Sequence, residues 1–293
     1  MTAGRSPEGR GKPPAGARVP AEAVACPVAV GTCGYSYTEW VDSGFYPPGT
    51  RTTEMLGLYG RSFPVVELNY TWYQMARAEA LARMVAGAPQ RLLFAAKLTR
   101  TMTHEREGQW REQARLFRQG IAPLGRRLAA VLVQFPPQFD RSVANRRYLA
   151  ALLDALHGLP LAVEFRHCSW ATDPVIAELE RRRVTLVAVD TPPLAELFPG
   201  LDVVTNPALL YLRLHGRNRE GWRAGNIQKK FNYDYSPEEL RTWRDRFLLP
   251  MAGRAERAMV FFNNHVRGQA PRNGLLLAEL LAEKGVPVGD DRP

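Results

Sequence analysis

The chain has 293 residues, of which 45% are hydrophobic, and a formal net charge of +10. It contains no run of 18 or more apolar residues, so we expect neither a transmembrane helix nor a membrane partner. The three cysteines, Cys26, Cys33 and Cys168, form an odd set without a spacing pattern. This excludes a disulfide framework and a thiolate metal site, and it is typical of a reducing compartment.

Residues 1–25 are rich in Gly, Pro, Ala and Arg and contain no continuous apolar segment. A secretory signal requires such a segment after its basic start, so we predict a disordered tail and a cytoplasmic location. The net charge is a weak indicator of nucleic-acid binding. Only five of the 39 basic residues are lysine, so the excess reflects a general arginine-rich composition.

After this tail, short apolar or β-branched runs predict eight strands, each followed by turn residues. In chain order they are Val28–Cys33, Val65–Tyr70, Leu92–Leu98, Ala130–Phe135, Leu161–Arg166, Val184–Asp190, Leu209–His215 and Met259–Asn264. Amphipathic segments predict helices over Thr53–Arg61, Ala76–Ala86, Gly108–Arg127 with a break near Pro123, Ser142–His157, Asp173–Arg183, Leu194–Leu197, Pro237–Leu248 and Ala270–Lys284. Ser236 and Glu239 predict a capping box at the start of the seventh helix.

Strict alternation of apolar strands and helices favours a parallel sheet that is covered on both faces. Eight such units predict the α/β class and a single-domain (β/α)8 barrel of the TIM type over residues 26–285, followed by a tail at 286–293. No Gly-x-Gly-x-x-Gly follows the first strand, and we expect no cofactor. The segments 34–52 and 216–235 are unusually long loops, a feature typical of functional or mobile segments.

Reactive groups in such a barrel stand at the carboxyl ends of its strands, here called the barrel mouth. Because side chains alternate with a period of two, the inward positions can be read from the sequence. They are Glu67, Asn69, Lys97, Gln134, Glu164, Arg166, Asp190, Tyr211, Arg213, His215, Asn263 and Asn264. Three acidic and three basic side chains balance in this set. It favours a ligand site because buried ion pairs are poor stabilisers. A self-neutralised ion-pair plug is the alternative.

Glu67 and Glu164 are the leading candidates for acid/base catalysis, since their strands lie on different sides of the mouth and could flank a substrate. Each could instead be an ion-pair partner, Glu164 with Arg166 or Lys97. Lys97 is the third catalytic candidate, as a group that neutralises charge or as a Schiff-base amine. The expected substrate-binding residues are Tyr35, Asn69, Gln134, Arg166, Asp190, Arg213, His215, Asn263 and Asn264. Asp190 could instead fix the turn that follows it.

We expect no bound metal, although oxygen and nitrogen ligands could converge at the mouth from Glu67, Glu164, Asp190, His215 and His265. Paired histidine spacing is absent, and three cationic side chains share the same region.

The second long loop is strongly basic. Its charges over residues 213–230 sum to +5 and come from Arg213, Arg217, Arg219, Arg223, Lys229, Lys230 and Glu220. Aromatic residues lie among or beside them at Trp222, Phe231, Tyr233 and Tyr235. Loops near the end of such barrels often bind phosphate, and arginine with aromatic rings also suits single-stranded nucleic acid. A solvated basic loop without a ligand is the alternative.

Several motifs together resemble the YecE-like family, domain of unknown function 72, over about residues 28–283. They are Gly31–Tyr35, Val66–Tyr73, Phe94–Lys97, Leu132–Pro137, Ala162–Trp170, Tyr211–Gly216, Tyr233–Ser236 and Phe262–His265. The resemblance implies a TIM-type barrel and does not supply an established reaction. Cys33 and Tyr35 differ from the family pattern, in which a small residue such as Ser and a Trp are usual.

These observations lead to a hypothesis of a barrel enzyme that uses carboxylate acid/base groups on a small, polar, anionic substrate, phosphate-like or nucleotide-like. Hydrolysis, isomerisation and lyase chemistry all remain open. The alternatives are a nucleic-acid-binding or nuclease-like barrel and a non-catalytic ligand sensor. The sequence does not indicate an oligomeric state.

Overall fold

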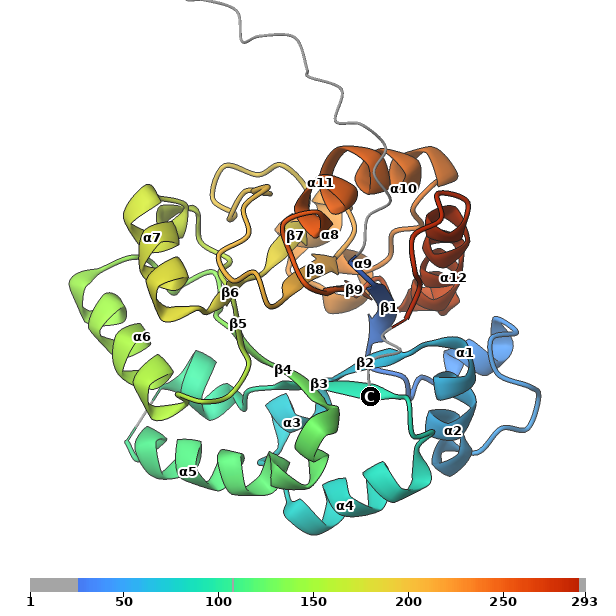
Figure 1. Cartoon of the computed structure of the whole chain (residues 1–293), viewed down its shortest axis with the longest axis horizontal. Helices are drawn as coiled ribbons and strands as arrows, with labels where there is room; N and C mark the ends of the chain where they lie inside the picture. The colour runs from blue at the N-terminus through green and yellow to red at the C-terminus, as the bar shows by residue number, and fades with distance from the viewer. Residues whose placement is uncertain (1–25, 107, 290–293) are drawn as a thin grey trace, which may run out of the picture.

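Parallel strands form the centre of the molecule in the computed structural model, which describes residues 26–106 and 108–289 (Figure 1). The strands are β1 (Val28–Cys33), β2 (Val65–Leu68), β3 (Leu93–Lys97), β4 (Leu128–Gln134), β5 (Leu161–Glu164), β6 (Thr185–Leu186), β7 (Ala188–Asp190), β8 (Leu210–Leu214) and β9 (Ala258–Phe262). Their order is β6-β5-β4-β3-β2-β1-β9-β8-β7. Every pair is parallel, and β1 pairs with both β2 and β9. The predicted α/β barrel of the TIM type is therefore confirmed.

The sixth predicted strand is present but divided, so that β6 pairs with β5 and β7 pairs with β8. Val187 lies between the halves and donates its N–H to the Val163 carbonyl at 2.9 Å. On the opposite edge of β6, the hydroxyl groups of two threonines take the place of backbone hydrogen bonds between strands. Thr205 Oγ1 accepts from the Leu186 N–H at 2.7 Å, and Thr185 Oγ1 donates to the Leu209 carbonyl at 3.2 Å. The barrel is therefore nearly closed, with this irregular strand at the junction.

Helices surround the strands in Figure 1 and include α2 (Thr52–Ser62), α4 (Ala78–Gly87), α5 (Trp110–Ile121), α6 (Val143–Ala155), α7 (Asp173–Arg182), α10 (Pro237–Trp243) and α12 (Gln269–Ala282). The third predicted helix does break near Pro123, where a 3-10 segment (Ala122–Arg127) follows α5. The seventh begins with the predicted capping box at Ser236 and continues past α10 through a π-helical turn (Arg244–Leu248) and α11 (Leu249–Ala252). The helical turn predicted at 194–197 is wrong. This segment forms a turn in which Leu197 makes an antiparallel bridge to His167.

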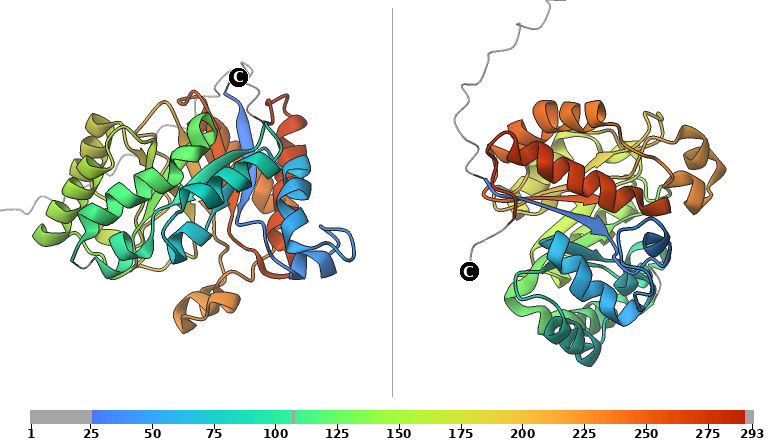
Figure 2. Two further views of the ribbon diagram at one scale, coloured as in Figure 1. Left: turned by 90° about the horizontal axis from the view of Figure 1, so that it is seen from below. Right: turned by 90° about the vertical axis from the view of Figure 1, so that its right-hand side faces the viewer.

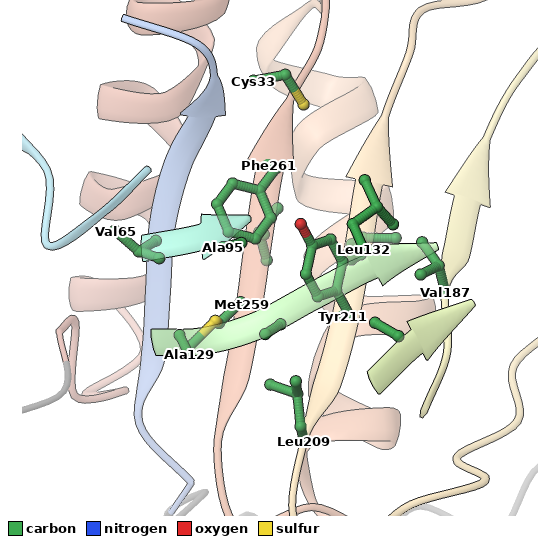
Figure 3. Packing of buried hydrophobic residues seen from close by; sticks show 14 of the residues in the cluster. Cys33, Val65, Ala95, Ala129, Leu132, Val187, Leu209, Tyr211, Met259 and Phe261 are labelled. Atoms are coloured by element: carbon green, nitrogen blue, oxygen red, sulfur yellow. The ribbon is translucent and has the colours of Figure 1, made fainter. Parts of the chain in front are cut away.

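Apolar side chains from many strands fill the barrel below its mouth (Figure 3). Val65, Leu132, Met259 and Phe261 are completely buried there. Gly31 allows β1 and β2 to approach one another closely, because a Cβ atom at this position would lie 2.1 Å from the Val65 carbonyl oxygen. The core ends where the polar side chains of the mouth begin.

The two long loops lie at the carboxyl end of the strands, and each contains helix (Figure 2). The first carries α1 (Glu39–Asp42), and α3 (Tyr70–Tyr73) follows β2 at the same end. The second carries α8 (Arg219–Ala224) and α9 (Ile227–Lys230), which project from the barrel in Figure 2. These helices were not predicted.

Near the other end of the barrel, residues 286–289 follow β1 instead of leaving the domain. The Val28 N–H donates to the Pro287 carbonyl at 2.9 Å, and the Gly289 N–H donates to the Val28 carbonyl at 3.1 Å. The predicted tail at 286–293 therefore begins as part of the fold. The predicted disordered segment 1–25 and residues 290–293 lie outside the described residues. Within residues 26–289, leaving out 107, no helix is both long and apolar enough to span a membrane.

Candidate functional site

The guanidinium group of Arg213, on β8, joins two carboxylates in the barrel mouth. Its Nη1 donates to Glu164 Oε2 at 2.5 Å, and its Nη2 donates to Glu67 Oε1 at 2.7 Å. Tyr211, also on β8, donates its hydroxyl to the second oxygen of Glu67 at 2.8 Å. The four side chains are at most 1% exposed. Buried charges need such pairing, since an isolated buried carboxylate is very unfavourable.

Glu164 also bonds to the second arginine of the mouth. Its Oε1 lies 2.5 Å from Nε of Arg166 and 3.4 Å from Nε2 of His215. His215 in turn has its Nδ1 2.9 Å from the side-chain nitrogen of Asn263. The ion pair between Glu164 and Arg166 was one of the two alternatives that the sequence left open for this carboxylate.

Two pKa shifts describe the charge state of this network. Burial acts to raise the pKa of Glu164, but Arg166 and Arg213 outweigh it and hold that pKa well below its ordinary value. Burial, helped by Arg166, lowers the pKa of His215 well below its ordinary value. At neutral pH the carboxylate is therefore ionised and the imidazole is neutral.

Lys97, at the end of β3, lies in the same mouth but does not join the ion pairs. Its Nζ lies 5.1 Å from the centre of the Trp72 ring, and the group forms no ion pair or hydrogen bond with another described residue. Burial and the nearby Arg213 lower the pKa of Lys97 to about 8. A lysine with this pKa is partly neutral near neutral pH and can exchange a proton with a substrate.

Lys230, at the end of α9, is a second lysine of this region that the sequence did not assign to the mouth. Its Nζ lies 3.7 Å from the centre of the Trp222 ring, and the same ring lies 5.2 Å from the guanidinium carbon of Arg166. Burial and Arg166 lower the pKa of Lys230 to about 7, with a smaller effect from Lys97. The clustering of Trp222, Lys230 and Phe231 in one predicted loop was the available signal.

The loop folds back through Asn218, which places Lys230 at the mouth. The Asn218 side-chain nitrogen donates to the carbonyls of Lys229 at 2.9 Å and Asn232 at 3.2 Å. Gly221 makes this close approach possible, because a Cβ atom there would lie 2.4 Å from the Lys229 backbone. The position of Lys230 at the mouth therefore depends on the fold of the loop and not on the alternation of side chains along a strand.

The mouth carries more positive than negative charge. The mouth contains four cationic side chains, Lys97, Arg166, Arg213 and Lys230. Two carboxylates, Glu67 and Glu164, lie among them, and His215 is neutral. In the part of the chain that the structure describes, Nη1 of Arg166 and Nε of Arg213 are buried without a hydrogen-bond partner, while Nε of Arg166 and Oε1 of Glu164 have only their mutual ion-pair contact. The positive charge in excess comes from the two partly buried lysines, and together with the unpartnered arginine nitrogens it fits a bound anion.

Other residues expected at the mouth make their contacts elsewhere. Asp190 accepts hydrogen bonds from Arg217 at 2.9 Å and from the Tyr235 hydroxyl at 2.6 Å. Asn264 donates to the Tyr233 carbonyl and to the Asn273 side chain, both at 2.7 Å. The two side chains hold the second long loop to the barrel and do not join the Arg213 network.

The remaining substrate-binding candidates lie nearer the surface or are bound to the backbone. Gln134 donates to the Phe135 carbonyl at 2.8 Å. Asn69 is partly buried and immediately precedes α3. Tyr35 is also partly buried, its carbonyl accepts from the Tyr46 hydroxyl, and burial raises its pKa. Within the described residues, none of these three side chains hydrogen-bonds to the charged cluster of Glu67, Glu164, Arg166 and Arg213.

The five side chains that were weighed as possible metal ligands do not come together in the described residues. Among residues 26–106 and 108–289, no group of three or more His, Cys, Asp and Glu side chains is placed to hold a metal ion. His265 stacks on the Tyr37 ring with 4.8 Å between ring centres, and its Nδ1 lies 3.5 Å from Glu39. His265 therefore packs against the first long loop.

The basic loop presents only part of its charge to solvent. Arg219, Arg223 and Lys229 are exposed, whereas Arg217 is paired with Asp190 and Glu239. Two of its aromatic rings are also covered, with Trp222 9% exposed and Tyr235 3% exposed. Rings on which nucleic-acid bases stack must be accessible, so these two are poor candidates for that role.

The chain is similar to proteins of one family along most of its length. The family described as "Protein of unknown function DUF72" matches residues 29–293. UPF0759 protein YunF of Bacillus subtilis (strain 168) is 29% identical over 262 residues, which is 83% of this chain and 93% of YunF. The crystal structure of a DUF72 family protein of Thermotoga maritima has a TM-score of 0.80 and 33% identity, covering 87% of this chain and 99% of that one. One from Enterococcus faecalis has a TM-score of 0.76 and 28% identity, covering 87% and 95%. On its sequence and fold, this barrel belongs to the DUF72 family of proteins of unknown function.

Proposed function

We propose that the chain is an enzyme whose substrate is a small anion, such as a phosphate ester, bound at the barrel mouth. The observation that carries this proposal is the excess of cationic groups there. Lys97 and Lys230 have no carboxylate partner of their own within the described residues, and Nη1 of Arg166 is buried without an acceptor. A phosphate dianion would supply the missing acceptors and negative charge.

The contacts favour different roles for the three catalytic candidates. Both Glu67 and Glu164 hold Arg213, and Glu164 also holds Arg166, so their geometry favours positioning of the cationic groups. Lys97 has an uncommitted amine and a pKa of about 8, so it is the best-placed proton donor or acceptor. This changes the sequence-based hypothesis, which gave the acid/base roles to the two carboxylates.

The rings around these cations favour a substrate with a compact anionic end. Lys97 lies over the Trp72 ring, and Arg166 and Lys230 lie over the Trp222 ring, so each of the three cations has an aromatic face beside it. Shielding from water strengthens the interaction between the cations and an anion. Arg166 and the lysines would bind the anion, while the rings would contact the adjoining part of the substrate.

A thermal unfolding titration with inorganic phosphate tests the proposal. At a phosphate concentration about a hundredfold above Kd, binding to the native state should add about 2.7 kcal/mol to the free energy of unfolding. The Lys230→Met variant should bind phosphate about tenfold or more weakly, because a hydrogen bond to a charged group contributes about 1.5–3 kcal/mol. Lys284→Met, at an exposed position beyond α12, is the matched control and should bind like the wild type. Equal phosphate affinity in all three proteins would rule out the site.

Nucleic-acid binding is the second candidate function, and it is supported only by the exposed Arg219, Arg223 and Lys229. Neutralisation of several phosphates would make the affinity fall steeply as salt concentration rises. The triple variant Arg219→Ala, Arg223→Ala, Lys229→Ala should then lose that affinity while its response to inorganic phosphate is unchanged.

A non-catalytic sensor would share the phosphate response and would show no turnover of any phosphate ester.

A further inference from the structure

We propose that Lys97 is a nucleophilic amine that forms an imine with an aldehyde or ketone carrying a phosphate or carboxylate group. The inference rests on the proposed function, because Arg166 and Lys230 would bind the anionic group of this substrate. It adds the nature of the reacting group, a carbonyl carbon next to Lys97, and a covalent step that anion binding alone does not require.

The geometry leaves the amine of Lys97 free, although two carboxylates lie in the same mouth. Three of the four oxygens of Glu67 and Glu164 accept hydrogen bonds from Arg213 or Tyr211, and the fourth, Oε1 of Glu164, lies 2.5 Å from Nε of Arg166 in an ion pair. Lys97 has only the face of Trp72 as a close partner in the described part of the chain. A lysine meant to neutralise a carboxylate would be paired with one. Among the described residues, Lys97 instead lies unpaired near both the arginines and the carboxylates of the mouth, and a desolvated lysine beside cationic groups is typical of amines that act as nucleophiles.

The environment of Lys97 also supplies the reactive, neutral form. Burial lowers its pKa to about 8, and the positive charge of Arg213 acts in the same direction. At about pH 7.5, roughly a quarter of such amines are neutral, against about one in a thousand for an ordinary lysine. The step needs no further reactant. The neutral nitrogen bonds to the carbonyl carbon, the two protons of the amine pass to the carbonyl oxygen, the C–O bond breaks as that oxygen leaves as water, and the C=N bond remains.

Reductive trapping with pyridoxal 5′-phosphate, an aldehyde that carries a phosphate, tests this step. The chain contains five lysines, so borohydride-fixed adducts can be assigned to single residues by peptide mass spectrometry. In the wild type at about pH 7.5, we expect about tenfold or more adduct at Lys97 than at the exposed Lys284. Pyridoxal, which lacks the phosphate, should label Lys97 much less, and inorganic phosphate should compete with pyridoxal 5′-phosphate.

Lys97→Arg is the matched variant, because it keeps the positive charge and cannot form an imine with the reagent. It should lose the adduct at position 97. Labelling of Lys230 in preference to Lys97, or equal labelling of Lys97 and Lys284, would overturn the imine proposal. If inorganic phosphate still stabilises the wild type in that case, the proposed anion site stands without the imine. If Lys97 is labelled selectively but phosphate neither stabilises nor competes, anion binding is what fails.

Discussion

Arg213 and Glu164 join strands β8 and β5 through a hydrogen bond of 2.5 Å between Nη1 and Oε2. The same guanidinium group reaches Glu67 on β2, so a single side chain connects three strands of the barrel. Each group in this arrangement is buried and is paired with a group of opposite charge. Removal of one member therefore leaves the rest with unpaired charge in the interior.

Replacement of Arg213 by Met should destabilise the protein by about 3–5 kcal/mol, because two buried carboxylates lose their common partner. The free energy of unfolding from urea titrations measures this loss. Arg219→Met is the matched control. Arg219 is exposed on α8, so its replacement should change stability by less than about 0.5 kcal/mol. An equally small effect at Arg213 would mean that the network contributes little to the native state.

The depressed pKa of Glu164 predicts a pH-dependent contribution to stability. A carboxylate whose pKa is lowered on folding stabilises the native state above its unfolded pKa, here about 4.5, and loses that contribution as pH falls through the folded value. Glu164→Gln should therefore be much less stable than the wild type at about pH 6, and the difference should narrow toward about pH 3. Urea titrations across this range measure the difference. The exposed Glu79→Gln on α4 should show no such trend, and a gap at Glu164 that does not vary with pH would contradict the expectation.

Most of the barrel could be predicted because each strand and helix carries its own local signal. The division of the sixth strand could not, since it depends on hydroxyl groups of Thr185 and Thr205 that replace ladder bonds. The two threonines are twenty residues apart. The pattern of apolar residues within Val184–Asp190 does not reveal these hydroxyl contacts. The segment is therefore predicted as one continuous strand.

The charged residues of the mouth could likewise be predicted where they lie on regular strands. Glu67, Glu164 and Arg213 all lie on regular strands. The side-chain period of two therefore correctly predicted that they lie together. Lys230 was assigned only to a basic loop, since its position depends on the way that α8 and α9 fold back. Asp190 ends the irregular sixth strand, where alternation no longer indicates which side chains meet.

Gly216→Ala should loosen the second long loop. Gly216 has φ of +85°, and a Cβ atom there would lie 2.5 Å from Cβ of Tyr233. Such a substitution combines backbone strain of about 1–3 kcal/mol with a steric clash. We expect lower stability in urea and faster limited proteolysis within residues 216–235. Gly253→Ala is the control, since φ is −60° and the nearest atom is 3.6 Å away. Equal behaviour of the two variants would show that the turn at Gly216 does not fix the loop.

Anion binding at the mouth should weaken as pH rises through the pKa values of the two lysines. Lys230 titrates at about 7 and Lys97 at about 8, and both bind an anion best when protonated. Sulfate is a suitable probe because it stays a dianion across this range. Its affinity should fall between about pH 6 and pH 9, and binding near pH 7.5 should take up protons, because a nearby anion raises both pKa values. Isothermal titration calorimetry in buffers of different ionisation enthalpy measures this uptake. Lys230→Met should remove the part of the uptake that is centred near pH 7. If sulfate binds with no proton uptake in the wild type, neither lysine changes its protonation on binding, and the site proposed for the anion would have to lie away from both.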